Sequence, residues 1–150
     1  MRESLEAGGG SPEAGVRRLE ADEALPAWVE RLDRTAFGSA WKAPSEQEGL
    51  WLLPERGFAR WTLVPAAAEA ELLRIAVDPA HRGGGLGRRL LEACPRDLAA
   101  AGMAHLVLEV RVSNASAMAL DRACGWKPCG LRRAYYPDGE DAALYELKLG

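Results

Sequence analysis

The clearest hydrophobic pattern in the chain is a strict alternation over residues 104–112. Apolar side chains there fall on one face and mostly polar or charged side chains on the other: Leu106, Leu108, Val110 and Val112 against His105, Val107, Glu109 and Arg111. A period of two is typical of a strand with one buried face. The pattern therefore predicts a half-buried strand that carries Glu109 on its more polar side.

Shorter apolar runs predict further strands at residues 16–20, 50–53, 58–64, 71–77, 126–131 and 142–149. Pro54, Glu55, Arg56 and Gly57 lie between two of these runs and have the composition of a hairpin turn. The order is hairpin strands first and strand-helix alternation afterwards, which favours a mixed α/β sheet.

Helical spacing predicts helices over residues 22–37, 86–101 and 115–123. Asp22 is the expected N-cap of the first, and Gly102 and Gly125 are placed to end the other two. Pro95 lies inside the second helix and predicts a kink between Leu91 and Pro95. Residues 38–49 are expected to form a loop or broken helix beside a substrate cleft.

The length of 150 residues, with 48% hydrophobic and 27% charged residues, is ordinary for one globular domain. Residues 1–15 include three consecutive glycines and little apolar surface, so they are expected to be a flexible leader. We expect residues 16–150 to form a single domain.

The net charge of −3 does not indicate a nucleic-acid surface, and no direct nucleic-acid partner is expected. Cys94, Cys124 and Cys129 are not in a metal-ligand spacing, which predicts no metal site. No signal peptide or long apolar run is evident, so the sequence predicts a reduced, cytoplasmic protein with no membrane contact.

A glycine-rich segment, R-x-x-G-x-G from Arg82 to Gly87, lies between a predicted strand and a predicted helix. Glycines let the backbone approach a ligand, and the first amides of a helix attract anions, so the segment is suited to a pyrophosphate. A turn that binds nothing is the plain alternative. A dinucleotide-binding loop does not fit, since the third glycine of G-x-G-x-x-G would fall on Arg88 or Leu90, and the Gly-Lys-Ser/Thr ending of a P-loop is missing.

This segment, together with the preceding residues 75–79, resembles the coenzyme A pyrophosphate loop of the GNAT acetyltransferases. The runs Leu108-Glu109-Val110-Arg111, Ser113-Asn114, Gly125-Trp126 and residues 133–142 are similar to the RimI subgroup of that family. The resemblance is continuous over residues 72–149 and faint before them. It implies a GNAT fold: a mixed, mostly antiparallel sheet of six or seven strands flanked by about four helices.

The resemblance implies acetyl transfer from acetyl-CoA to the N-terminal amine of a protein, with alanine the expected first residue and a small-subunit ribosomal protein a candidate partner. The coenzyme would be bound by one set of residues: Ile75, Ala76, Val77, Arg82, Gly83, Gly84, Gly85, Leu86, Gly87, Arg88 and Asn114. Asn114 is equally suited to capping the helix that follows it. If Arg88 and Arg89 do not contact the phosphates of the coenzyme, they are plain surface residues on the outer side of their helix.

Glu109 is the general base that the resemblance implies, although it is also suited to pairing with Arg111 on the same strand face. RimI-like enzymes carry a tyrosine as the acid twelve residues beyond this base, where the chain has Asp121. An aspartate is ionised at neutral pH unless strongly desolvated, and in that form it would repel a thiolate. The identity of the proton donor therefore stays open between water, the intermediate's own ammonium group and Tyr136.

Phe37, Trp41, Tyr135 and Tyr136 are the residues expected to bind the acceptor, although the two tyrosines also suit the core of a terminal hairpin. Two other functions fit the sequence: a catalytically weak acyl-CoA-binding sensor, and a GNAT enzyme for a small-molecule amine or lysine. A monomer or weak homodimer is expected.

Overall fold

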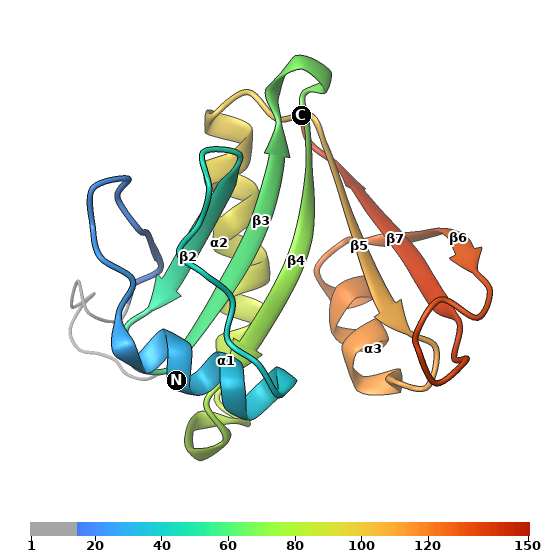
Figure 1. Cartoon of the computed structure of the whole chain (residues 1–150). Coiled ribbons are helices and arrows are strands. Elements are labelled where there is room, and N and C mark those ends of the chain that lie inside the picture. Colours follow the sequence, from blue (N-terminus) through green and yellow to red (C-terminus); the bar gives the residue numbers. More distant parts are fainter. Residues whose placement is uncertain (1–14) are drawn as a thin grey trace.

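The computed structural model describes residues 15–150, which form a seven-stranded sheet and three α-helices (Figure 1). The strands are β1 (Arg17–Arg18), β2 (Glu48–Leu53), β3 (Gly57–Val64), β4 (Glu69–Val77), β5 (His105–Arg111), β6 (Lys127–Arg132) and β7 (Ala142–Lys148). The α-helices are α1 (Ala27–Phe37), α2 (Leu86–Ala100) and α3 (Ala115–Ala123). Short 3-10 helices span Pro65–Ala67 and Pro79–His81. The predicted leader lies outside the described residues, except for its last residue.

The strand order is β1-β2-β3-β4-β5-β7-β6, and every neighbouring pair is antiparallel except β4 and β5. The expected mixed, mostly antiparallel GNAT-type sheet is therefore confirmed. About four helices were predicted, whereas the described residues form three α-helices and two short 3-10 helices. The number of α-helices is lower because the chain between α1 and β2 forms no helix.

The helices cover both faces of the sheet. Side chains of α2, including Leu90 and Leu98, pack on the face that carries Trp61, Leu106 and Leu108, and α3 adds Ala117 and Met118 to this core. Residues of α1 pack on the opposite face with Leu50, Leu52 and Phe58. We call this opposite face the α1 face.

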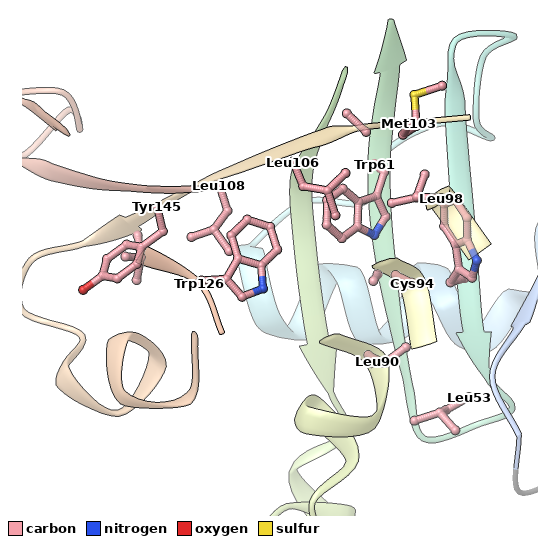
Figure 2. Close-up of a cluster of buried hydrophobic side chains, with 14 of the residues drawn as sticks. Leu53, Trp61, Leu90, Cys94, Leu98, Met103, Leu106, Leu108, Trp126 and Tyr145 are labelled. Atoms are coloured by element: carbon pink, nitrogen blue, oxygen red, sulfur yellow. The ribbon is translucent and has the colours of Figure 1, made fainter. Parts of the chain in front are cut away.

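The main core is aromatic-rich, as Figure 2 shows. The rings of Trp61 and Trp126 stack with centroids 6.2 Å apart, and both side chains are buried. Trp126 follows α3 and Trp61 lies on β3, so this contact joins the two halves of the sheet on either side of β4 and β5. Burial raises the pKa of the Cys94 thiol in the same core to about 12, which makes it unreactive at neutral pH.

Two local predictions are corrected by the structure. The first helix begins at Ala27 after the extended residue Pro26, and Asp22 is not its N-cap. The residue before a proline is biased to extended backbone, which separates Asp22 from the helix. The first strand contains Arg17 and Arg18 where residues 16–20 were predicted.

Other predictions agree closely. The α3 bounds match those predicted, and β5 shows the predicted alternation of burial. Helix α2 continues through Pro95 without a break, and the kink near Leu91 stays a prediction.

Candidate active site

The two parallel strands β4 and β5 are paired over three positions and then separate. Their last paired positions are Glu71 and Val107, although both strands continue for several residues. Figure 1 shows them diverging toward their carboxyl ends. Among residues 15–150, the backbone of β4 from Leu72 onward therefore has no strand partner on the β5 side.

A β-bulge occurs in β4 where this separation begins. Trp61 pairs with Leu72 and Arg60 with Arg74, so Leu73 is an extra residue. Bulges bend a strand and re-aim its side chains, and they are frequent beside active sites. This bulge bends β4 at the point where it leaves β5.

The glycine-rich loop lies at the carboxyl end of β4 and leads into α2. Gly83 and Gly85 have φ of 87° and 76°, and a Cβ at either position would meet no heavy atom within 4 Å. Their positive φ is favourable for glycine and strained for other residues. The first turn of α2 adds amides with no intrahelical acceptor and a partial positive charge. The loop is thus an open, donor-rich surface.

Gly87 lies where the start of α2 packs against its neighbours. A Cβ there would meet Leu120 Cδ2 at 3.4 Å and Val77 Cγ2 at 4.0 Å. The N-terminus of α2 is therefore held against both α3 and the end of β4.

The arginines of this region have intramolecular partners. Arg82 Nε donates to the carbonyl oxygen of Val77 at 3.3 Å. Arg88 forms an exposed ion pair with Glu92, at 3.2 Å from Nε to Oε2. Such exposed pairs contribute little stability, so Arg88 can exchange Glu92 for an anion with little cost.

Glu109 lies on β5 past the point where the strands separate, and it faces the α1 side. Its side chain is 15% exposed, and Arg132 Nη1 on β6 lies 3.2 Å from its Oε2. Oε2 is buried and accepts no hydrogen bond from the residues that the structure describes. The alternative pairing with Arg111 is wrong, because Arg111 binds Asp138 at 2.9 Å and Glu140 at 2.8 Å.

Tyr135 and Tyr136 belong to the loop between β6 and β7, beside Glu109. A hydrogen-bonding interaction with Glu109 and its negative charge raise the pKa of Tyr135. Burial, followed by the charge of Glu109, raises the pKa of Tyr136. Their rings meet edge to face at 5.1 Å between centroids, and Tyr135 is 46% exposed. They are therefore not core residues of a hairpin.

Asp121 lies in α3, and the residue is 5% exposed. Burial raises the pKa of this carboxyl group to about 6. A group with this pKa is partly protonated near neutral pH, so desolvation gives the aspartate the acid form that a solvated aspartate lacks.

Asn114 caps α3, as one of its two predicted roles required. Its Oδ1 accepts from the amide of Ala117 at 3.2 Å and from the hydroxyl of Ser116 at 3.2 Å. The side-chain amide nitrogen, a donor, is not used by these bonds.

Phe37 and Trp41 are joined through Arg74 of β4. The Arg74 guanidinium lies 4.6 Å from the Phe37 ring centroid and 4.1 Å from that of Trp41. It also donates to Asp33 Oδ1 at 2.7 Å, while Asp33 Oδ2 accepts from the amide of Trp41 at 2.9 Å. The loop after α1 is therefore fixed to β4 next to the bulge.

Sequence reasoning did not identify Arg74 or Asp33, and it marked Arg132 only as part of an arginine cluster with Arg133, not as the partner of Glu109. Asp33 is 2% exposed on the side of α1 that carries Val29 and Leu32. A carboxylate on the buried, apolar side of a helix needs a cation beside it. The position of Asp33 was the one signal in the sequence that pointed to such a cationic partner.

Within residues 15–150, no three His, Cys, Asp or Glu side chains are grouped as metal ligands. None of the helices described has the length and apolar character needed to cross a bilayer.

Comparisons with known proteins agree with this geometry. The acetyltransferase (GNAT) family profile matches residues 14–126. The [ribosomal protein bS18]-alanine N-acetyltransferase of Escherichia coli K12 is 49% identical over 84 residues, covering 54% of this chain and 57% of that protein. The N-alpha-acetyltransferase RimI of Mycobacterium tuberculosis is 48% identical over 75 residues, covering 49% of this chain and 46% of that one. The matched regions thus span about half the length of these curated relatives.

Solved structures extend the likeness to most of the chain. The crystal structure of the ribosomal-protein-S18-alanine N-acetyltransferase from Escherichia coli has a TM-score of 0.75 and 33% identity, with 90% of this chain and 93% of that chain covered. A Bacillus subtilis acetyltransferase in complex with CoA has a TM-score of 0.73 at 13% identity, covering 91% and 99%, and shows the same fold. With the family profile and the sheet topology, these matches establish that the chain belongs to the GNAT acetyltransferase family.

Proposed function

We propose that the protein transfers an acetyl group from acetyl-CoA to the N-terminal amine of a protein. One observation carries the proposal: an open glycine loop at the start of α2 lies at the end of β4, where β4 leaves β5, and Glu109 lies on β5 two residues past the last paired position. This arrangement supports adjacent binding of a diphosphate and an acyl group beside the proposed base.

The coenzyme would be held mainly by backbone. The amides of residues 83–88 suit its diphosphate, since φ at Gly83 and Gly85 and the open space around them leave room for a ligand. The amide-containing pantetheine arm would extend β4 by strand-like pairing at Ile75, Ala76 and Val77, on the side that β5 has left. A β4 amide would polarise the thioester carbonyl, and Asn114 would add a donor from the end of β5.

The acceptor amine would attack the thioester carbon, and the C–S bond would break after a tetrahedral intermediate. Glu109 would take the proton that the amine loses, through its largely buried carboxylate. Arg132 orients this carboxylate by its ion pair at 3.2 Å.

The departing thiolate would take the proton of Asp121. The raised pKa of about 6 leaves a usable protonated fraction at neutral pH, and a thiolate needs only modest help to leave. Tyr136 is less well matched to this role, because burial raises its pKa above the ordinary value of tyrosine. We propose Asp121 as the acid, since its helix α3 packs beside the glycine loop, with Leu120 next to Gly87 at the start of α2.

The acceptor would lie between the Phe37–Trp41 segment and Tyr135 and Tyr136. The two regions border the α1 face on either side of the strand separation. The relatives named for acetylation of the bS18 alanine support an N-terminal alanine and a ribosomal acceptor, which would place the reaction in the cytoplasm.

The test uses purified protein, acetyl-CoA and a short peptide that begins with alanine, with free thiol release and peptide mass as readouts. We expect acetylation at the α-amine and none on an N-terminally blocked peptide that contains lysine. Coenzyme binding without thiol release would favour the acyl-CoA sensor, and acetylation of the blocked peptide would favour a lysine acetyltransferase. Either result would contradict the proposal.

A further inference from the structure

We infer that Glu71 binds the incoming amine as an ammonium ion and so makes a free N-terminus a requirement for acceptors. This role rests on the proposed function and adds an acceptor-binding residue to it. Glu71 is separate from the base: it would hold the charged amine, and Glu109 would then remove the proton.

The register places Glu71 and Glu109 on the same face of the sheet. Glu71 lies opposite Val107 in the parallel β4–β5 pair, and Glu109 is two residues beyond Val107. Residues two apart on a strand share a face, and so do paired residues on adjacent strands. Both carboxylates are therefore on the α1 face, one at the last paired position and one just past it.

The pair carries an excess negative charge. Arg132 lies 3.2 Å from Glu109, and pairing through β7 puts it on the same face. Arg111 is already bound to Asp138 and Glu140, and His105 is bound to Glu69 and Glu146. In the part of the chain that the structure describes, Arg132 is thus the cation that faces these two half-buried carboxylates, and a second cation would balance them.

The titration of Glu71 agrees with this account. Burial raises its pKa, the negative charge of Glu109 raises it further, and Arg132 lowers it. A carboxylate in this position gains more from a bound cation than a solvated one does. A peptide α-amine has a pKa near 8 and is mostly an ammonium ion at neutral pH, so it supplies that cation.

Acetylation would end the interaction. The product is a neutral amide, which has no charge to offer Glu71, so the residue favours binding of the substrate over the product. An N-terminally blocked peptide would be excluded for the same reason.

The experiment measures Kd and steady-state constants for the alanine-initiated peptide and Kd for its blocked form. It uses the wild-type protein, Glu71→Gln, Glu71→Asp and the control Glu69→Gln. Glu69→Gln removes the same charge two residues away on the same strand and face. Direct binding is measured in the presence of coenzyme A, and thermal unfolding checks that each variant is folded.

We expect Glu71→Gln to raise Kd and KM for the free peptide about tenfold, as for loss of one charge-assisted hydrogen bond, and to change kcat less than threefold. Glu71→Asp should restore part of the affinity, and Glu69→Gln should bind like the wild type. Wild-type affinity in Glu71→Gln, an equal loss in Glu69→Gln, or loss of kcat with unchanged KM would overturn the inference.

The two proposals fail in different ways. A wild-type protein that binds the free peptide in preference to the blocked one but releases no thiol contradicts the proposed function alone. A wild-type protein that acetylates the free α-amine but binds the free and blocked peptides with equal affinity contradicts the inference alone. A protein that binds neither peptide contradicts both.

Discussion

Arg132 and Glu109 come from different strands and form an ion pair of 3.2 Å at the site. Glu109 belongs to β5 and Arg132 to the edge strand β6, with β7 between them. The pairing Glu109–Leu144 and Ala142–Arg132 sets the two side chains diagonally on one face. The edge of the sheet thereby determines how the proposed base is held.

Glu109→Gln keeps the shape of the side chain and removes its ability to take a proton. We expect kcat to fall about 10²-fold or more with coenzyme affinity unchanged, because general base catalysis has this magnitude. Steady-state kinetics with calorimetric coenzyme titration measures both. Arg132→Gln is the companion variant, and it should lower kcat because the carboxylate loses the cation that orients it. Wild-type kcat in Arg132→Gln would show that the ion pair does not affect the base.

Asp121→Asn removes the proposed acid. We expect kcat to fall about tenfold to hundredfold, and the decline of wild-type kcat above pH about 6 to be absent from the variant. Stopped thiol-release assays between pH 5 and 9 give the profiles. A variant with wild-type kcat would show that the thiolate leaves without help from position 121.

Asp121→Asn should also change how the free energy of unfolding depends on pH. The folded-state pKa of Asp121 is raised from 3.8 to about 6, so its stabilising protonated form is fully present below about pH 4 and lost as pH rises through 6. The asparagine variant has no ionisable group at this position, so it does not lose stability as the pH rises through 6. Urea unfolding should show Asp121→Asn gaining about 1–2 kcal/mol relative to wild type between pH 4.5 and pH 8. A gain independent of pH would contradict the assignment of a raised pKa.

Gly85→Ala should weaken coenzyme binding at least tenfold. The φ of 76° at Gly85 strains an alanine, and the added methyl group enters the space in front of the loop amides. Gly102→Ala is the matched control, since Gly102 has φ of 95° and open space but lies beyond the far end of α2. Both variants should lose about 1 kcal/mol of stability. Equal coenzyme affinity in the two would show that the loop does not bind it.

His105→Gln should destabilise the protein more at pH 6 than at pH 9. His105 Nδ1 lies 2.8 Å from Glu69 and Nε2 2.7 Å from Glu146, and these contacts raise its pKa above 6.5. The resulting stability is present below about pH 6.5 and lost as pH rises through the folded-state pKa. We expect the His105 contacts to contribute under about 1 kcal/mol to the free energy of unfolding, since the ring is partly exposed. His81→Gln, on an exposed 3-10 turn, is the control, and equal behaviour of the two would refute the prediction.

Features set by local sequence were predicted well. Asn114 and Gly125 bracket α3, and both ends of that helix were predicted correctly. The alternation around Glu109 placed it on the less buried face of β5, and the glycines between β4 and α2 marked the loop. Each of these depends on residues close together in the chain.

Features set by long-range pairing were not predicted. The Arg74–Asp33 pair joins residues 41 positions apart, and Arg132 reaches Glu109 only through the register of β7. The pKa of Asp121 depends on burial that α3 acquires by packing on the sheet. A single sequence does not contain the register or the packing, so these partners emerge only from the fold.

Calorimetric titration of the wild-type protein with coenzyme A, and with pantetheine as the analogue without a diphosphate, tests the central claim most directly. We predict saturable binding of coenzyme A and at least 100-fold weaker binding of pantetheine, because the amides of residues 83–88 would contact the diphosphate. Equal affinity for the two compounds, or no binding heat with millimolar coenzyme A, would contradict the account.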